Sequence, residues 1–323
     1  MSTVMSRTEG QAHDTTQSPY WIHALTPLHV GSGRGIGFID LPIMREEVTG
    51  YPFVPGSAVK GVLADHHGAD DEARDESKQN GKFKRDLKLA FGAGGDEFAN
   101  SGAIVFTDAR LVCLPVRSLY GTFAWCTSHL VLKRLQRDLV RCHDSWKPMP
   151  PQATDNARIV VADPSTSALV KDQRVFFEDL DFSAAKEDSA AGWARSLAAS
   201  VFPDPAWQDL FVKRFAIVHD DVFAFLCETA TQVDARVKID DDTKTVADGQ
   251  LWYEESLPAE SILSGIVWCG PVFGNNGNRN DPEKRRQLMK DFCGGSHYLQ
   301  LGGKATVGRG QVKLTFTDGA SPG

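Results

Sequence analysis

Two side chains that could carry acid–base chemistry stand at the ends of a glycine-rich segment. His29 precedes residues 31–37, which contain four glycines, and Asp40 follows them. So many glycines exclude a regular helix or strand, and closure of the resulting loop would bring the imidazole and the carboxylate to one site. A carboxylate can hold a divalent metal or activate a hydroxyl, and a histidine can move a proton, which suits RNA cleavage. On residue types alone, a core histidine and a turn-capping carboxylate are equally good interpretations.

Two further carboxylates, Glu254 and Glu255, lie next to each other late in the chain. They add candidate acid–base groups. Solvated charge at the end of a hairpin is the simpler interpretation of this pair.

Basic side chains accompany three glycine-rich turns. Glycine lets backbone N–H groups approach a phosphate closely, and a neighbouring Lys or Arg supplies charge. One such turn is usually only a tight turn, but three together suit a phosphodiester chain. The residues predicted to contact RNA are Gly31, Gly33, Arg34, Gly56, Ser57, Lys60, Arg236, Gly303, Lys304, Thr306 and Arg309.

Spacing excludes several familiar enzyme signatures. Ile36 stands where a G-x-G-x-x-G dinucleotide fingerprint needs its third glycine, and Tyr298 stands where a P-loop needs its first. Residues 57–60 match the S-x-x-K of penicillin-binding enzymes, but neither S-D-N nor K-T-G follows. HExxH and G-x-S-x-G are absent from the sequence.

Composition describes a globular chain. Its 323 residues are 41% hydrophobic and 24% charged, and the net charge of -7 requires any RNA site to be a local basic groove on an acidic body. No apolar run approaches the roughly 20 residues that cross a bilayer, and the N-terminus lacks a secretory apolar segment, which predicts a cytoplasmic protein without membrane partners. The six cysteines form no CxxC pair, which predicts reduced, mostly buried thiols.

The elements that must position these residues alternate between strands and helices. Ser57 is a candidate N-cap for a helix that carries Lys60, and Ser128 for a helix with an apolar face at Val131, Leu132, Leu135 and Leu139. Strict alternation of apolar and polar residues predicts an exposed β-hairpin over 231–253. Further strands are predicted at 21–27, 103–112, 261–269, 298–301 and 311–316, and a charged helix at 282–292.

Three segments are predicted to lie outside the regular core. Residues 1–19 are polar and unpatterned, which predicts a flexible leader. Residues 66–82 are almost entirely charged or polar, which predicts an exposed loop or frayed insert. Residues 144–204 are rich in Pro, Ser, Ala and Asp without a sustained period, which predicts an insertion.

Several blocks of the sequence together resemble a known family. Residues 25–33, 37–46 and 52–61 closely resemble the RAMP-superfamily backbone subunit of type III-B CRISPR effector (Cmr) complexes, the family of the fourth Cmr subunit. Its other signature blocks are matched, in order, by residues 106–111, 115–121, 251–258 and 302–310. The resemblance spans roughly residues 21–316 and is far more specific than a lone glycine loop.

This resemblance implies an α+β fold: a ferredoxin-like, RNA-recognition-type palm with inserted finger regions and a protruding β-hairpin thumb. Residues 20–323 would form one domain, with insertions at about 66–82 and 144–204, the thumb at about 231–253 and a C-terminal glycine-rich loop at 302–310. It also implies that copies stack head to tail along a CRISPR RNA, beside other Cmr-type subunits, with thumbs interrupting the guide–target duplex at regular intervals.

The resemblance further implies a guide-directed endoribonuclease with Asp40 as the nuclease residue. Target RNA would be cut by its own 2′-hydroxyl, with a divalent metal (Mg²⁺ or Mn²⁺) at Asp40. His29 would assist, Glu254 or Glu255 would contribute more weakly, and Lys60 and Arg309 would grip the guide backbone. The acidic turn at residues 240–242 is unexpected beside RNA unless it touches a neighbouring subunit or solvent.

Two alternatives remain open on the sequence. In the first, the chain is a non-catalytic RNA-binding scaffold of the same kind of complex, and Asp40 only caps the glycine loop. In the second, the isolated chain processes precursor guide RNA without metal, using His29. The scaffold alternative predicts that Asp40→Ala leaves assembly and target cleavage unchanged. The processing alternative predicts that the isolated chain is active in the presence of chelator.

Overall fold

The structure is a computed structural model that describes residues 17–33, 35, 37, 39–72, 78–93, 100–142, 149–239, 246–273 and 279–317. Arg34 and the turn at 240–242, both singled out above, lie outside the described residues. The helices are α1 (Gly56–Glu72), α2 (Lys78–Phe91), α3 (His129–Cys142), α4 (Asp188–Val201), α5 (Pro205–Arg214), α6 (Asp220–Thr229), α7 (Pro282–Phe292) and the 3₁₀ turn η1 (Ala305–Val307). The strands are β1 (Gln17–Ala24), β2 (Phe53–Val54), β3 (Gly92–Ala93), β4 (Asn100–Ser101), β5 (Ile104–Phe106), β6 (Ala109–Arg117), β7 (Phe123–Ser128), β8 (Arg158–Val161), β9 (Arg174–Phe177), β10 (Leu180–Lys186), β11 (Phe215–Val218), β12 (Gln232–Ile239), β13 (Val246–Ser256), β14 (Ile262–Cys269), β15 (Ser296–Gln300) and β16 (Gln311–Phe316).

A ferredoxin-like palm forms the centre of the main sheet. Its antiparallel strands lie in the order β16-β1-β14-β6, and α1 follows β1 while α7 connects β14 to the C-terminal strands. This is the β-α-β-β-α-β arrangement, and it confirms the α+β fold that the resemblance implies. β14, α7, β15 and β16 also confirm the elements expected from sequence in this part of the chain.

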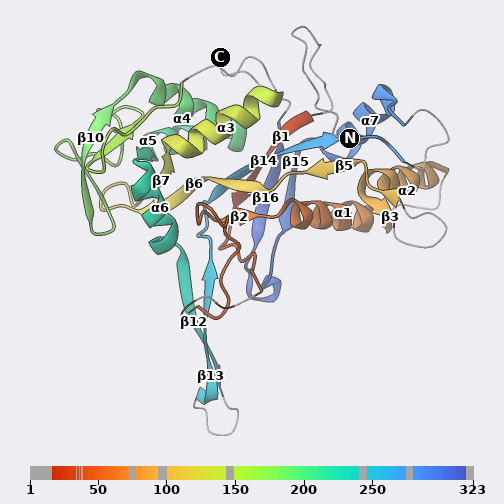
Figure 1. Cartoon of the computed structure of the whole chain (residues 1–323), viewed down its shortest axis with the longest axis horizontal. Coiled ribbons are helices and arrows are strands. Elements are labelled where there is room, and N and C mark those ends of the chain that lie inside the picture. The colour runs from red at the N-terminus through yellow and green to blue at the C-terminus, as the bar shows by residue number, and fades with distance from the viewer. Residues whose placement is uncertain are drawn as a thin grey trace.

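Helices cover both faces of this palm (Figure 1). The side chains of β1 alternate between two cores: Tyr20 and Ile22 pack in the core that contains Leu63 of α1, whereas Trp21 packs in the core that contains Leu132 of α3. Period-two alternation explains how one strand serves both cores. Because apolar side chains fill both faces, neither face of the sheet itself is open to a polar ligand.

The segment at 144–204, which was predicted to be an insertion, contains regular strands and a helix in its described part. β8 joins the main sheet beside β11 and β10, and α4 buries Trp193 and Leu197 against the second core. Alanines supply much of the buried face of α4, and this small-residue face hid the helical period in the sequence.

Two other boundaries also differ from expectation. α1 continues to Glu72 and α2 begins at Lys78, so most of 66–82 is helical although its residues are polar. Polar residues do not oppose helix formation when one face is buried, and His67 is only 7% exposed. At the N-terminus, β1 begins at Gln17, which is earlier than the predicted leader boundary at residue 19.

The predicted hairpin at 231–253 is confirmed, and its second strand continues to Ser256. β12 and β13 form a separate antiparallel pair that projects from the body (Figure 1). The pairs Ala235–Tyr253 and Val237–Leu251 place exposed apolar side chains on one face. The opposite face carries Gln232, Asp234, Arg236, Trp252 and Glu254.

The two predicted helix caps have different outcomes. Ser128 caps α3 as predicted, because its Oγ accepts the Val131 N–H at 3.4 Å. Ser57 lies inside α1, and the carboxylate of Asp108 instead accepts the Gly56 N–H at 2.9 Å. A β-carbon at Gly56 would lie 2.5 Å from the Phe106 carbonyl oxygen, so only glycine lets the helix start approach this turn so closely.

All six cysteines are free and buried, which confirms the expected reduced thiols. Burial raises the pKa of Cys142 to about 11. No helix in the described ranges is long and apolar enough to cross a membrane.

Candidate functional site

Three segments that are far apart in the sequence meet at the base of the β12–β13 hairpin. The loop after β1 pairs with β13 through the bridge between Leu41 and Glu254. The glycine-rich loop before β16 reaches the hairpin through ion pairs of Lys304 and Arg309. The geometry therefore assembles both glycine-rich segments and the hairpin into one site, which the sequence alone could only list separately.

Asp40 is exposed and fixed to the edge of β13. Its Oδ2 accepts the backbone N–H of Tyr253 at 2.8 Å. The next residue, Leu41, donates to the Tyr253 carbonyl at 3.1 Å and accepts from the Glu255 amide at 3.0 Å. Backbone hydrogen bonds thus fix the carboxylate in position while leaving it open to a ligand.

His29 is buried and is anchored to the same strand. Its Nδ1 lies 2.6 Å from the Glu255 carbonyl oxygen, a contact in which a neutral imidazole must donate from Nδ1. Its own carbonyl accepts the Gly303 N–H at 2.9 Å. A β-carbon on Gly31 would come within 3.0 Å of the His29 Nε2. The ring is therefore packed where the two glycine-rich loops meet, on the strand that also holds Asp40.

The carboxylate of Glu255 is buried and fully engaged. Its Oε1 accepts hydrogen bonds from Arg45 at 2.5 Å and Thr231 at 2.9 Å, and its Oε2 accepts the Ile43 amide at 3.0 Å. Arg45 also donates to the carbonyls of Gly50 and Cys227. These contacts bind the loop that carries Asp40 to β13 and to the end of α6, which gives Glu255 a positioning role in this geometry.

Glu254 forms the centre of a second polar group on the other face of the hairpin. Its Oε1 accepts from Lys304 at 2.6 Å and Trp252 at 2.7 Å, and its Oε2 lies 3.4 Å from Arg236 Nε. Burial raises the pKa of Glu254, but the hydrogen bonds from Lys304 and Trp252 and the nearby positive charges outweigh burial and hold it below its usual value. Glu254 is therefore ionised and neutralises two of the predicted RNA-binding cations.

Arg309 makes a similar contact with the hairpin. Its Nη2 donates to Asp234 at 2.5 Å, and its Nη1 is buried without a hydrogen-bond partner among the described residues. A buried guanidinium N–H without a partner is costly, so this atom favours an incoming acceptor such as a phosphate oxygen.

Lys304 has a backbone conformation that lysine rarely adopts. Its φ is +68°, in the left-handed region, although glycines stand at 302, 303 and 308. Strain of about 1–2 kcal/mol at such a position is tolerated where the side chain is needed. Thr306 lies exposed in η1, and Gly33 is exposed with a φ of +78°.

The residues at the start of α1 belong to a different neighbourhood. Lys60 donates from Nζ to the Ile104 carbonyl in β5 at 2.9 Å, and burial lowers its pKa. Ser57 is exposed beside it, and Gly56 is bound to Asp108. Their hydrogen bonds connect Gly56 and Lys60 to the turn before β6 and to β5, and not to the hairpin base.

A divalent metal would find one open carboxylate in this site, that of Asp40. The carboxylates of Asp234, Glu254 and Glu255 are engaged by cations and other donors. No group of three or more His, Cys, Asp or Glu in the described residues is arranged to hold an ion. Mg²⁺ commonly binds one or two carboxylates and completes its shell with waters and substrate phosphates. Asp40 fits a metal ion of that kind, whose remaining ligands come from RNA.

Several functional residues were missed by sequence reasoning. Tyr253 acts through its backbone amide, and Arg45 and Asp234 act through partners more than 70 residues away in the sequence. Arg45 stands three residues after the L-P of the Asp40 block, but nothing in the sequence indicates its partner.

Comparison with known proteins shows the family. The model of the RAMP superfamily matches residues 21–313. The chain is a member of the RAMP superfamily. A relative from Pyrococcus furiosus, named the CRISPR system Cmr endoribonuclease Cmr4, is 33% identical over 304 residues, which cover 92% of this chain and 94% of the relative.

Solved structures agree with this RAMP assignment. Oligomeric Cmr4 from Pyrococcus furiosus superimposes with a TM-score of 0.67 and 27% identity, over 93% of this chain and 97% of that one. A chain of the type III-B Cmr-beta complex bound to cognate target RNA gives a TM-score of 0.68 at 19% identity, over 93% of this chain and 96% of that one, which shows the same fold.

Proposed function

We propose that this RAMP protein is a backbone subunit of a type III-B effector complex that binds CRISPR RNA, stacks with other copies and with other Cmr-type subunits, and cleaves complementary target RNA. The observation that carries the proposal is the exposed Asp40 carboxylate, fixed by the Tyr253 amide at the base of the projecting hairpin. The endoribonuclease name of the 33% identical relative supports it. The complex would act in the cytoplasm.

The hairpin would separate the bases beside the cleavage site. Its apolar face exposes Val237, Ile239, Leu251 and Tyr253 by 37–57% of their surface. Contact with unstacked bases would remove this apolar surface from water, which is favourable. The ring of Tyr253 could also stack on a base. Because Asp40 is bound to the backbone of Tyr253, the carboxylate lies where the target strand would be distorted.

Cleavage would then follow from positioning. The target 2′-oxygen attacks the adjacent phosphorus, the bond to the 5′-oxygen breaks, and the products are a 2′,3′-cyclic phosphate and a 5′-hydroxyl. Asp40 would accept the proton of the 2′-hydroxyl, and water would protonate the leaving oxygen. A divalent cation at Asp40 would supply neutralising charge to the phosphate when bound. His29 would hold the two glycine-rich loops together beneath this site.

Lys304, Arg236 and Arg309 would bind the RNA backbone. All three cations are held by hairpin carboxylates before RNA arrives, which keeps their long side chains in place. RNA phosphates would bind these cations beside the carboxylates or in their place. Arg309 Nη1, which has no hydrogen-bond partner among the described residues, would gain an acceptor.

The test is cleavage of a labelled RNA complementary to the guide by complexes with native chain, Asp40→Asn or Asp209→Asn. Asn retains an acceptor for the Tyr253 amide, and Asp209 is a matched exposed aspartate on α5. We expect regularly spaced cuts to vanish for Asp40→Asn and in chelator, with target binding and the Asp209→Asn complex unaffected. Normal cutting by Asp40→Asn would instead make the chain a non-catalytic scaffold.

A further inference from the structure

Two neighbouring residues of the loop that carries Asp40 bind opposite parts of the molecule. Arg45 donates to the Glu255 carboxylate of β13 at 2.5 Å. The carboxylate of Glu46 accepts two hydrogen bonds from Arg134 of α3, of 2.8 and 2.5 Å. The backbone at Arg45 forms an antiparallel bridge, and successive side chains of an extended segment point to opposite sides. The loop is therefore held by side chains on both of its sides.

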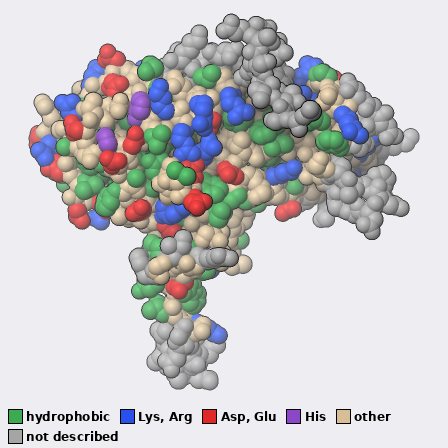
Figure 2. Space-filling view, viewed as in Figure 1, with side chains coloured by type: hydrophobic (Ala, Val, Ile, Leu, Met, Phe, Trp, Pro, Cys, Tyr) green, Lys and Arg blue, Asp and Glu red, His purple; other side chains and the backbone are tan. Residues whose placement is uncertain are grey.

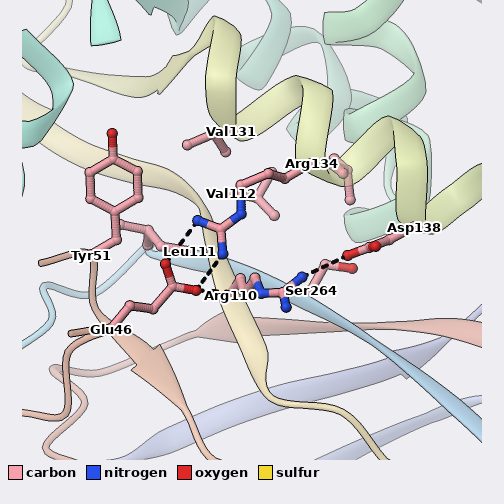
Figure 3. A pocket seen from close by; sticks show the side chains of 10 residues that line it. Glu46, Tyr51, Arg110, Leu111, Val112, Val131, Arg134, Asp138 and Ser264 are labelled. Atoms are coloured by element: carbon pink, nitrogen blue, oxygen red, sulfur yellow. Dashed lines mark hydrogen bonds and ion pairs between the residues drawn. The ribbon is translucent and has the colours of Figure 1, made fainter. Parts of the chain in front are cut away.

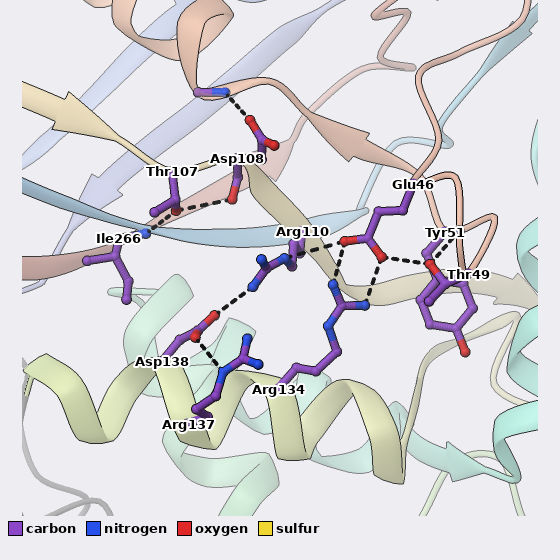
Figure 4. A network of polar contacts seen from close by, with 11 residues as sticks. Glu46, Thr49, Tyr51, Thr107, Asp108, Arg110, Arg134, Arg137, Asp138 and Ile266 are labelled. Carbon is purple, nitrogen blue, oxygen red and sulfur yellow. Dashed lines mark hydrogen bonds and ion pairs between the residues drawn. The ribbon is translucent and has the colours of Figure 1, made fainter. Parts of the chain in front are cut away.

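The Glu46 carboxylate lies between two guanidinium groups (Figure 4). Arg134 binds both of its oxygens, and Arg110 of β6 lies 3.4 Å from Oε1. Thr49 donates to Oε2 at 2.6 Å. Burial raises the pKa of Glu46, but the hydrogen bonds from Arg134 and Thr49 and the two positive charges outweigh burial and hold this pKa below its usual value. Glu46 is therefore ionised at neutral pH, and donors fix both of its oxygens.

The ion pair of Glu46 and Arg134 lies in the wall of a hollow beside α3 (Figure 3). The hollow holds about 350 Å³ including its mouth. Its apolar lining comes from β6 and α3 and consists of Leu111, Val112, Val131 and Leu135. Apolar walls keep water from one side of the contact, and an ion pair is stronger where the local dielectric is low. With side chains only 19% and 22% exposed, this pair holds the loop more firmly than a solvated surface pair would.

The helix that holds Glu46 is itself fixed. Leucines of α3 pack in the second core. The first turn of α3 is tied to α6, because the carboxylate of Asp220 accepts the Leu130 N–H at 2.9 Å. α6 in turn holds Arg45, which donates to the Cys227 carbonyl at 2.9 Å. The two helices that hold residues 45 and 46 are thus bound to each other.

Arg134 differs from the other basic side chains of α3. Figure 2 shows Lys and Arg side chains gathered over this helix. Lys133, Arg137 and Arg141 follow each other at intervals of four residues and are exposed. Positive charge alone would suit an RNA contact. Both Nη groups of Arg134, however, are engaged by Glu46, which suits a contact within the chain.

This contact limits how the loop that carries Asp40 can move. An extended segment that is held from one side can still rotate about its own axis, and Arg45 alone would leave it that freedom. Rotation would shift Leu41, whose backbone pairs with β13 directly beside Asp40. Glu46 removes the freedom by binding the opposite side of the segment to α3.

We infer that Arg134 is a positioning residue for Asp40 that acts through Glu46. The inference rests on the proposed function and extends it, because it gives α3 a role in cleavage. A displacement of about 1 Å can lower the rate of a reaction about 100-fold, so a loosened loop slows cleavage although neither side chain takes part in the chemistry.

Alanine substitutions at both ends of the contact test this role in the complex assembled on guide RNA. The variants are Glu46→Ala, Arg134→Ala and the two combined. One control, Asp86→Ala, breaks a different ion pair, which joins α2 to Lys284 of α7 at 2.5 Å. A second control, Lys133→Ala, removes an exposed positive charge from α3 itself.

Four readouts separate positioning from other roles. Hydrogen exchange of the Tyr253 amide reports the position of Asp40, because this amide donates to the Asp40 carboxylate. The affinity for target RNA and the cleavage rate at saturating target distinguish a positioning residue from an RNA contact. Thermal unfolding measures any general loss of stability.

We expect both single variants to cut at least about tenfold more slowly, to bind target as tightly as the native complex and to exchange the Tyr253 amide faster. The combined variant should be no slower than either single variant, because each one breaks the same contact. Lys133→Ala should match the native complex in every readout. Asp86→Ala should lower the unfolding temperature without changing cleavage or exchange at Tyr253.

Four results would overturn the inference. The first is native exchange of the Tyr253 amide in Glu46→Ala and Arg134→Ala, and the second is additive losses of rate in the combined variant. The third is equally fast exchange in Asp86→Ala, because loss of stability would then explain the effect. The fourth is weaker target binding by Arg134→Ala at an unchanged cleavage rate, which would make Arg134 an RNA contact. A native complex that does not cut target would refute the proposed cleavage alone, since exchange at Tyr253 still tests the positioning.

Discussion

The backbone amide of Tyr253 donates a hydrogen bond of 2.8 Å to the carboxylate of Asp40, across 213 positions of sequence. This one contact joins the element that would distort RNA to the group that would act on it. Because an amide holds the carboxylate, the position of Asp40 is independent of the side chain at residue 253. The geometry therefore predicts that substitutions at Tyr253 alter RNA distortion and leave the location of Asp40 unchanged.

Glu255→Gln should destabilise the protein by about 3 kcal/mol. The glutamine cannot neutralise Arg45, whose side chain is only 20% exposed, and breaking one side of a buried ion pair leaves an uncompensated charge. Urea unfolding checks this, with Glu47→Gln as an exposed control on the same loop. If Glu255→Gln is as stable as the native chain but does not cleave RNA, Glu255 has a catalytic role and not a positioning one.

Glu254 should make the free energy of unfolding depend on pH in the acid range. Its pKa in the folded protein is below the ordinary value of 4.5, so its stabilising effect is complete above that value and is lost as the pH falls through the folded pKa. The native chain should lose more stability than Glu254→Gln between neutral and acid pH. Parallel pH profiles of the two proteins would contradict this assignment.

The parts of this arrangement that were predictable from sequence are those that depend on local pattern. Alternation in residues 232–239 predicted the hairpin, and α7 follows its predicted bounds because Asp281 and Pro282 mark its start. The α1 cap was not predictable, because Asp108 supplies it from a distant turn.

For the site, the sequence predicted which residues belong to it but not how they are arranged. His29, Asp40 and Lys304 were recognised by type and by their glycine-rich surroundings, but the strand that unites them contributes backbone atoms. Backbone donors and acceptors leave no signature in residue identity. The engaged state of Glu254 and Glu255 was equally hidden, because their partners lie about 50 and 210 positions away.

Gly302→Ala should disrupt the site much more than Gly308→Ala. Both glycines have left-handed φ values, +74° and +76°, so each substitution costs about 1–2 kcal/mol in backbone strain. At Gly302 the new methyl group would also lie 2.2 Å from the His29 carbonyl oxygen, whereas nothing lies within 4 Å at Gly308. Thermal unfolding and RNA affinity should both fall further for Gly302→Ala, and equal effects would show that the two loops do not touch.

Lys304→Ala should weaken RNA binding in a way that depends on salt. Each lost phosphate contact lowers the slope of log K against log salt by about 0.7 for single strands, because one fewer counterion is released. Lys290→Ala, an exposed lysine on α7, is the control and should leave the slope unchanged. Titrations of guide RNA at several salt concentrations measure both slopes. An unchanged slope with Lys304→Ala would mean that this lysine serves only Glu254, to which it is bound at 2.6 Å.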